Sequence, residues 1–137
     1  MAAVYFRSLD EAEVIDVEFL KPRGGARLLR LLVDSGFTGK SSVVLGRDAS
    51  ELVRAQVSPT QVSGALQGAQ DRGWVTCRVL ELSFQCTIIA IITDTSVLSL
   101  PPGVHGMAGL SFLRQFARWG AEKTANGWRF FLSNTHD

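Results

Sequence analysis

The chain has 137 residues, of which 46% are hydrophobic, and 14 basic against 13 acidic residues leave a formal net charge of +1. This length and composition fit one globular domain that buries its own core, which excludes a largely disordered chain. The near balance of charge excludes a broad nucleic-acid surface and a polybasic membrane patch.

The first half of the chain predicts a β-hairpin, a short strand and a helix. Residues 14–19 alternate apolar and polar side chains, as a half-buried strand does. A turn containing Pro and Gly separates them from a returning strand over residues 27–33. Another short strand is expected over residues 41–45. Residues 48–57 are the best helix candidate in this half, and Pro59 would end that helix.

The middle of the chain predicts an exposed segment followed by two strands. Residues 61–73 are rich in Gly, Gln and Ala, and we expect a mobile hairpin or loop there. Residues 74–84 alternate at period two, which favours a strand. Residues 87–93 are apolar on both faces, which indicates a central strand.

The last third predicts one more helix and a final hairpin. Residues 107–116 suit a short helix with apolar side chains on one side. Asn126-Gly127 is a strong turn signal for a hairpin between residues 116–123 and 128–133. Many short strands with one or two short helices predict an all-β fold, a small closed or nearly closed β-barrel.

The segment around Asp34 carries the clearest chemical signal. An apolar strand, residues 31–33, runs directly into Asp34-Ser35-Gly36. Such a strand delivers the carboxylate into a poorly solvated place. Gly36 lets the backbone turn sharply and approach closely, and Ser35 can brace the turn by a local hydrogen bond.

Residues 32–38 (LVDSGFT) resemble the active-site loop of retropepsin-like aspartic proteases. About 70 residues later, residues 107–113 (MAGLSFL) resemble the second motif of that family, in which small or apolar residues and a Gly precede a short helix. The order of the other elements also fits. The resemblance covers about residues 13–133 and implies an acid-protease-type barrel, with residues 1–12 and 134–137 as loose ends.

The resemblance implies that Asp34 is the one catalytic carboxylate of each subunit. The supporting residues would be Ser35, Gly36 and Thr38 in the loop, and Ala108 and Gly109 in the second motif. Peptide hydrolysis by this route needs two carboxylates that share one proton, for which aspartic proteases are the standard example. A chain this short cannot hold two lobes. The resemblance therefore implies a twofold homodimer, with Asp34 of each subunit at the axis and a peptide or protein as substrate.

Two further segments are assigned through the same resemblance. A substrate flap is expected around residues 62–73, with its tip at Gly64, Ala65, Leu66, Gln67 and Gly68. The C-terminal hairpin is a candidate dimer interface through Trp128, Phe130 and Phe131. Phe37 stands where the family usually has Ala, and it could narrow the cleft beside Asp34.

Two other interpretations of the Asp34 segment stay open, and Asp94 is a second candidate carboxylate. Asp34 could be a plain turn aspartate on a catalytically inactive, dimeric peptide-binding module. Gly39-Lys40-Ser41 resembles the end of a phosphate-binding P-loop, but the position that needs Gly holds Asp34, which would repel phosphate. Asp94 also follows an apolar strand, but no Gly follows its hydroxyl neighbour, so we expect a polar strand end.

Location and cofactors are constrained by what the sequence lacks. Cys77 and Cys86 form no CxxC pair, so neither a disulfide framework nor a thiolate zinc site is expected, and both should be reduced thiols. The N-terminus lacks the pattern of a signal peptide. The longest apolar stretch, near residues 88–92, is far shorter than the ~20 residues of a membrane helix. We therefore expect a cytoplasmic protein without a membrane partner, a metal or a cofactor.

Overall fold

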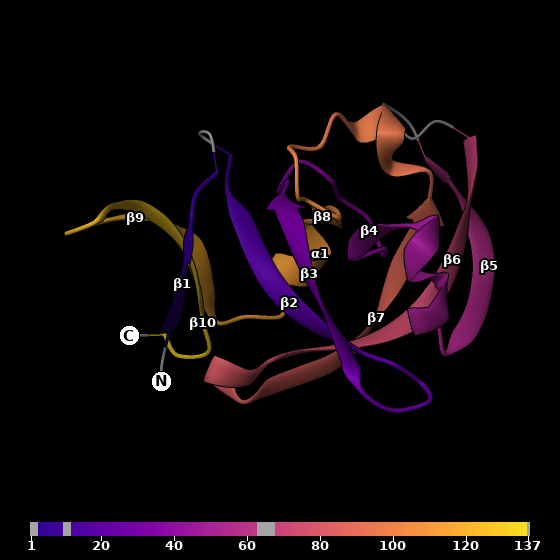
Figure 1. The fold of residues 1–137 in the computed structure, drawn as a ribbon, viewed down its shortest axis with the longest axis horizontal. Coiled ribbons are helices and arrows are strands. Elements are labelled where there is room, and N and C mark those ends of the chain that lie inside the picture. The colour runs from indigo at the N-terminus through magenta and orange to yellow at the C-terminus, as the bar shows by residue number, and fades with distance from the viewer. Residues whose placement is uncertain (1–2, 10–11, 63–67, 137) are drawn as a thin grey trace.

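The alternating and apolar runs of the sequence form a closed β-barrel (Figure 1). The computed structural model describes residues 3–9, 12–62 and 68–136. Six strands pair in the order β2-β3-β8-β4-β7-β6, and β6 pairs again with β2 to close the barrel. The strand bounds are Val14–Leu20 (β2), Ala26–Val33 (β3), Val43–Gly46 (β4), Gly68–Val79 (β6), Phe84–Thr93 (β7) and Gly106–Ala108 (β8). The predicted closed all-β barrel is confirmed.

The remaining elements lie around this barrel. Strand β5 (Ala55–Val62) pairs only with β6 and extends the sheet outward. Within the described ranges, the helical segments are the 3-10 turns Arg47–Leu52 (η1), Leu80–Leu82 (η3) and Thr95–Leu98 (η4), and the α-helix Leu110–Leu113 (α1). Among the described residues, no helix has both the length and the apolar content needed to cross a membrane.

Alternating side chains of the first hairpin contribute to the barrel core. Ile15, Val17 and Phe19 on β2 are fully buried, and Leu31 on the paired strand β3 is buried as well. Strand β7 lies between β4 and β6 and is apolar on both faces, because each face packs against a hydrophobic cluster. One face joins the main core, while Ile91 joins a second, smaller cluster. The predicted central strand is therefore confirmed.

A separate antiparallel sheet of three strands lies beside the barrel, at the left of Figure 1. Its order is β1 (Ala3–Arg7), β10 (Gly127–Ser133) and β9 (Arg118–Thr124). The final hairpin is confirmed, although its two-residue turn is Ala125-Asn126 between the paired Thr124 and Gly127.

The prediction of a loose N-terminus is wrong for residues 3–7. Strand β1 pairs with β10 over its whole length, and the Phe6 side chain is buried in the main core. The Tyr5 hydroxyl also donates a hydrogen bond of 2.8 Å to Glu122 on β9, across the intervening β10. These residues become ordered through a partner strand at the other end of the chain.

Both helix predictions are too long. Residues 48–57 give only the short turn η1, and Pro59 lies inside β5 instead of ending a helix. The register with β6 shifts between Val57 and Thr60, and an irregular edge strand tolerates a proline. Of residues 107–116, the first two belong to β8, and α1 covers only Leu110–Leu113. Backbone pairing of β8 on both of its sides overrides the helical periodicity.

The strand expected over residues 74–84 ends early. Strand β6 stops at Val79, and the 3-10 turn η3 then reverses the chain into β7. Leu80 and Leu82 have the spacing of strand residues, yet Leu80 is 57% exposed and Leu82 is buried. The segment is the bend of a long β6–β7 hairpin, in which Val79 pairs with Phe84.

Two leucines of β3 provide a matched test of this fold. Leu31 is fully buried, whereas Leu28 is 60% exposed. We expect Leu31→Ala to lower the free energy of unfolding by about 2–5 kcal/mol, because it leaves a cavity in the core. Leu28→Ala should change it by less than about 1 kcal/mol, since little packing is lost. Urea unfolding of both variants measures this, and equal losses would contradict the described orientation of β3.

Candidate active site

Asp34 lies immediately after β3, where the chain leaves the barrel. Its backbone N–H donates a hydrogen bond of 2.9 Å to the carbonyl oxygen of Ala108 on β8. Its carboxylate Oδ1 accepts one of 3.0 Å from the N–H of Gly36, and its carbonyl oxygen accepts one of 3.1 Å from Phe37. The backbone of the loop is thus fixed, but the expectation of a poorly solvated carboxylate is wrong for the single chain, because Asp34 is exposed to solvent.

The fold brings the two sequence motifs into direct contact. Strand β8 runs parallel to β3 and antiparallel to β4, so Ala108 is paired with Val33 on one side and Val43 on the other. The N–H of Gly109 donates to the carbonyl oxygen of Ser42 (2.9 Å), and the N–H of Leu110 donates to the carbonyl oxygen of Phe37 (2.9 Å). The Asp34 loop and the start of α1 are therefore one hydrogen-bonded unit.

Gly109 is required by the close approach of these two segments. A Cβ atom at this position would lie 2.5 Å from Cδ2 and 2.8 Å from the carbonyl oxygen of Phe37. The Phe37 ring therefore lies against the Gly109 backbone. It also packs on the second hydrophobic cluster, which comprises Val44, Ile91 and Met107 with the partly buried Leu98. These contacts hold the ring beside the loop.

Sequence reasoning missed one pair of residues in this unit. The hydroxyl groups of Ser42, at the entrance to β4, and Ser111, on α1, are 2.9 Å apart and share a hydrogen bond. Ser42 is almost fully buried. Two serines beside the predicted motifs were visible in the sequence, but nothing in their spacing indicated that they meet.

The other predicted loop residues lie at the surface. Ser35 and Thr38 are exposed, and Thr38 borders an open cavity of about 380 Å³ next to α1. The cavity is lined by Thr38, Gly39, Leu110, Ser111, Arg114 and Gln115. The Asp34 loop thus has a hollow on its α1 side with one cationic side chain, Arg114, at its border.

The expected flap is described only in part. Gly64, Ala65, Leu66 and Gln67 lie outside the described residues. Gly68 begins β6 with a left-handed backbone (φ 95°) and pairs with Val62, so the arms on either side form the β5–β6 hairpin. In Figure 1 the end of β5, the beginning of β6 and the end of β3 are all on the upper side of the barrel.

Asp94 is accounted for by local structure. It follows β7, and its Oδ1 accepts a hydrogen bond of 3.0 Å from the backbone N–H of Ser96, which caps η4. This hydrogen bond lowers the pKa of the Asp94 carboxyl. Asp94 and Asp34 thus make the same local bond, but only the Asp34 backbone is joined to β8.

The P-loop alternative lacks its main structural element. Gly39 does adopt a left-handed backbone (φ 110°), as a tight loop requires. However, Lys40 and Ser41 lead into strand β4 and not into a helix. Phosphate binding in a P-loop uses the backbone N–H groups at a helix N-terminus, and η1 begins only after β4.

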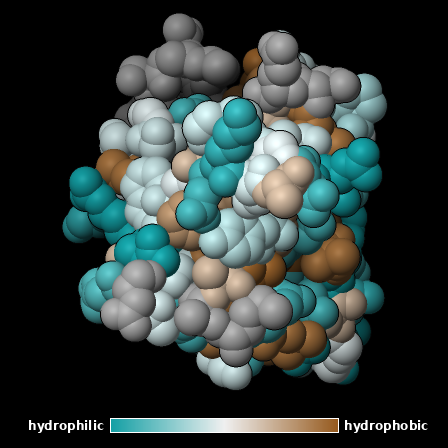
Figure 2. Space-filling model, turned by 90° about the vertical axis from the view of Figure 1, so that its left-hand side faces the viewer, coloured by the Kyte–Doolittle hydropathy of each residue, from teal (hydrophilic) through white to brown (hydrophobic). Residues whose placement is uncertain are grey.

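The C-terminal hairpin offers less apolar surface than expected. Phe130 and Phe131 are 4% and 8% exposed, whereas Trp128 is 58% exposed. Phe131 is covered by the Tyr5 ring and the Arg118 guanidinium, the latter 5.2 Å from its centroid. Figure 2 shows the side of the molecule on which this sheet lies, and its hydrophobic residues are separated by polar ones. Only Trp128 of the three predicted interface residues is widely exposed.

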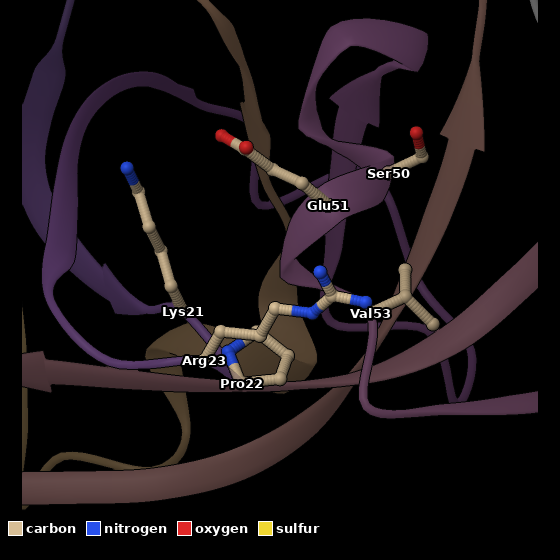
Figure 3. Close-up of a pocket in the computed structure, with 6 residues that line it drawn as sticks. All are labelled: Lys21, Pro22, Arg23, Ser50, Glu51 and Val53. Atoms are coloured by element: carbon tan, nitrogen blue, oxygen red, sulfur yellow. The ribbon is translucent and has the colours of Figure 1, made fainter.

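A second hollow lies away from these motifs (Figure 3). It has a volume of about 470 Å³ and lies between the turn after β2 and η1. Its lining residues are Lys21, Pro22, Arg23, Ser50, Glu51 and Val53. None of the predicted site residues contributes to it. Within the described ranges, no group of three or more His, Cys, Asp or Glu side chains is placed to hold a metal ion.

No protein-family model matches the chain, and no curated protein matches it. Similarity therefore assigns neither a family nor an activity. The resemblance of residues 32–38 and 107–113 to the retropepsin-like proteases remains a hypothesis, and its structural counterpart is the hydrogen-bonded junction between Asp34 and Ala108.

The Gly109–Phe37 contact gives a testable prediction. We expect Gly109→Ala to lower the free energy of unfolding by about 1–3 kcal/mol, because the new methyl group overlaps the Phe37 ring and carbonyl. In a Phe37→Ala background the ring is absent but the carbonyl remains, so the same substitution should cost less without becoming neutral. A double-mutant cycle by urea unfolding measures this, and strict additivity would contradict the contact.

Proposed function

We propose that the chain is one subunit of an aspartic endopeptidase, in which Asp34 from each of two identical subunits supplies the catalytic dyad. The observation that carries this proposal is the junction at Asp34. A carboxylate on a fixed backbone follows a barrel strand, and that backbone is hydrogen-bonded to the strand leading into Gly109 and α1. The carboxylate itself is left exposed for a partner.

The chemistry explains why two subunits are needed. Two carboxylates held close together cannot both ionise, so they retain one shared proton. The ionised Asp34 would take a proton from a water molecule as it attacks the scissile carbonyl carbon. The protonated Asp34 of the second subunit would donate its proton to the carbonyl oxygen. The first Asp34, now protonated, would then donate its proton to the amide nitrogen, while the second Asp34 takes back a proton from a hydroxyl group of the tetrahedral intermediate. The C–N bond breaks, the amine and the carboxylic acid leave, and the two carboxyl groups again share one proton.

The proposed substrate is an extended peptide or protein segment. It would lie between the two Asp34 loops and the β5–β6 hairpins, and form backbone hydrogen bonds as an added strand does. The hairpin has the length for such a role, since β5 and β6 span Ala55–Val62 and Gly68–Val79. Side chains would alternate between the two sides of the cleft. A homodimer and a cytoplasmic location belong to this proposal.

Replacement of the Asp34 carboxylate tests the activity. We expect wild-type protein to cleave members of a peptide library, assayed at several pH values by mass spectrometry. Asp34→Asn should reduce the rate by at least about 1000-fold, because the amide cannot act as acid or base. Asp94→Asn is the matched control, since Asp94 makes the same type of local hydrogen bond, and it should retain activity.

Each outcome of that assay has a consequence. Equal cleavage by wild type and Asp34→Asn would contradict the assignment of Asp34. Loss of activity in Asp94→Asn as well would indicate a dyad within one chain and contradict the homodimeric site. No cleavage by wild type under any condition would favour a catalytically inactive dimeric module on the same fold.

Mixing wild-type and Asp34→Asn subunits tests whether the active site needs an Asp34 residue from each of two subunits. When wild-type and Asp34→Asn subunits are exchanged in equal amounts, only a quarter of randomly formed dimers hold two Asp34 residues. Activity should therefore fall to about a quarter of that of the same total amount of wild type. A fall to one half would mean that each subunit acts alone. Steady-state cleavage of one peptide at constant total protein measures the difference, with Asp94→Asn subunits as the control mixture.

A further inference from the structure

Two cysteines that the proposed protease chemistry does not use lie opposite each other in the barrel. Cys77 on β6 and Cys86 on β7 are register partners in an antiparallel pair, and their Sγ atoms are 3.7 Å apart. Both thiols are free in this structure. Directly opposed residues in antiparallel strands have Cα atoms about 4.5–5.5 Å apart, which falls within the range that a disulfide spans.

The two thiols differ in accessibility. Cys77 is fully buried, whereas Cys86 is only partly buried, at the edge of the main core. The hydrogen bond between the thiols lowers the pKa of Cys86, and together with burial it raises the pKa of Cys77. A thiolate is the attacking species in thiol–disulfide exchange. Cys86, the more accessible thiol and the one with the lowered pKa, is therefore suited to attack, and the buried Cys77 beside it is suited to resolve the mixed disulfide.

We propose that Cys77 and Cys86 form a redox-active dithiol, which small-molecule disulfides such as glutathione disulfide convert into an intrachain disulfide. The Cys86 thiolate attacks one sulfur of glutathione disulfide, forms a mixed disulfide and releases one glutathione thiolate. Cys77 then loses its proton and attacks the Cys86 sulfur, so the Cys77–Cys86 bond forms and a second glutathione leaves. The two cysteines lose two electrons and two protons, and both glutathiones leave as thiols.

The position of the Cys77–Cys86 disulfide in the barrel would give it a structural effect. Cys77 is also the register partner of Phe19 on β2, in the strand pair that closes the barrel. A disulfide would therefore join β7 to β6 beside the closing contact. It would also hold the strand that continues into the β5–β6 hairpin. This inference does not depend on Asp34, and it can be tested with a protein that has no protease activity.

Trypsin separates the two cysteines, which makes the bond easy to detect. Cleavage after Arg72, Arg78 and Arg114 leaves Cys77 in residues 73–78 and Cys86 in residues 79–114. Folded wild-type protein is equilibrated in glutathione redox buffers, quenched with acid, alkylated and digested without reductant. We expect a linked pair of these two peptides. The ratio of disulfide to dithiol should rise tenfold for each tenfold rise in the ratio of glutathione disulfide to the square of glutathione.

Single substitutions test the order of attack. In Cys77→Ala, Cys86 should accumulate as a mixed disulfide with glutathione, because no resolving thiol remains. In Cys86→Ala, the buried Cys77 should stay unmodified under the same buffer. The wild-type digest needs no substitution, so it remains decisive if a variant fails to fold.

Several results would overturn the inference. These are two free thiols in wild type at the most oxidising ratio, a mixed disulfide in wild type that does not resolve, and a disulfide between two chains. Modification of Cys77 ahead of Cys86 would also contradict it.

Discussion

The close contact between the loop after β3 and the backbone at Gly109 is the constraint on which the fold and the candidate site both depend. Strand β8 is only three residues long, yet it is hydrogen-bonded to β3 on one side and to β4 on the other. Its backbone carbonyl at Ala108 receives the N–H of Asp34. A side chain at residue 109 would separate these segments, so a glycine there is a packing requirement of the barrel.

The same contact also determines how a single chain presents the Asp34 carboxylate. The bonds that orient Asp34 come from the backbone, and they hold the loop without covering the carboxylate. If Asp34 were buried and paired with a second carboxylate of the same chain, the pair would be complete within that chain. An exposed Asp34 carboxylate instead remains accessible to a second copy of the chain. The Phe37 ring, which departs from the expected small residue, is held by Gly109 and by the cluster around Ile91. Loop geometry is thus stabilised by hydrophobic packing on one side and by strand pairing on the other.

Local patterns in the sequence were sufficient to predict where barrel strands lie, but not which segments they contact. The alternation at residues 14–19 and the double-sided apolar run at 87–93 predicted β2 and β7, because burial on one or two faces leaves a periodic signature. The helix predicted over residues 48–57 is wrong because this range spans the end of one element, η1, and the start of another, β5, and a proline at an irregular edge strand has the same sequence appearance as a helix end. The Ser42–Ser111 hydrogen bond depends on where α1 lies relative to β4, and the Cys77–Cys86 pair depends on strand register; composition and spacing encode neither.

The pairing of β1 with β10 has a consequence for the order of folding. Ala3 is paired with Ser133, so the first described strand finds its hydrogen-bonding partner almost at the other end of the chain. During synthesis β1 must wait, with Phe6 uncovered, until β10 has left the ribosome. Closing so long a loop is costly in entropy, and contacts of this kind slow folding. The barrel strands have closer partners, so the three-stranded sheet would assemble last, and a nascent chain held before residue 127 would expose its unpaired first strand.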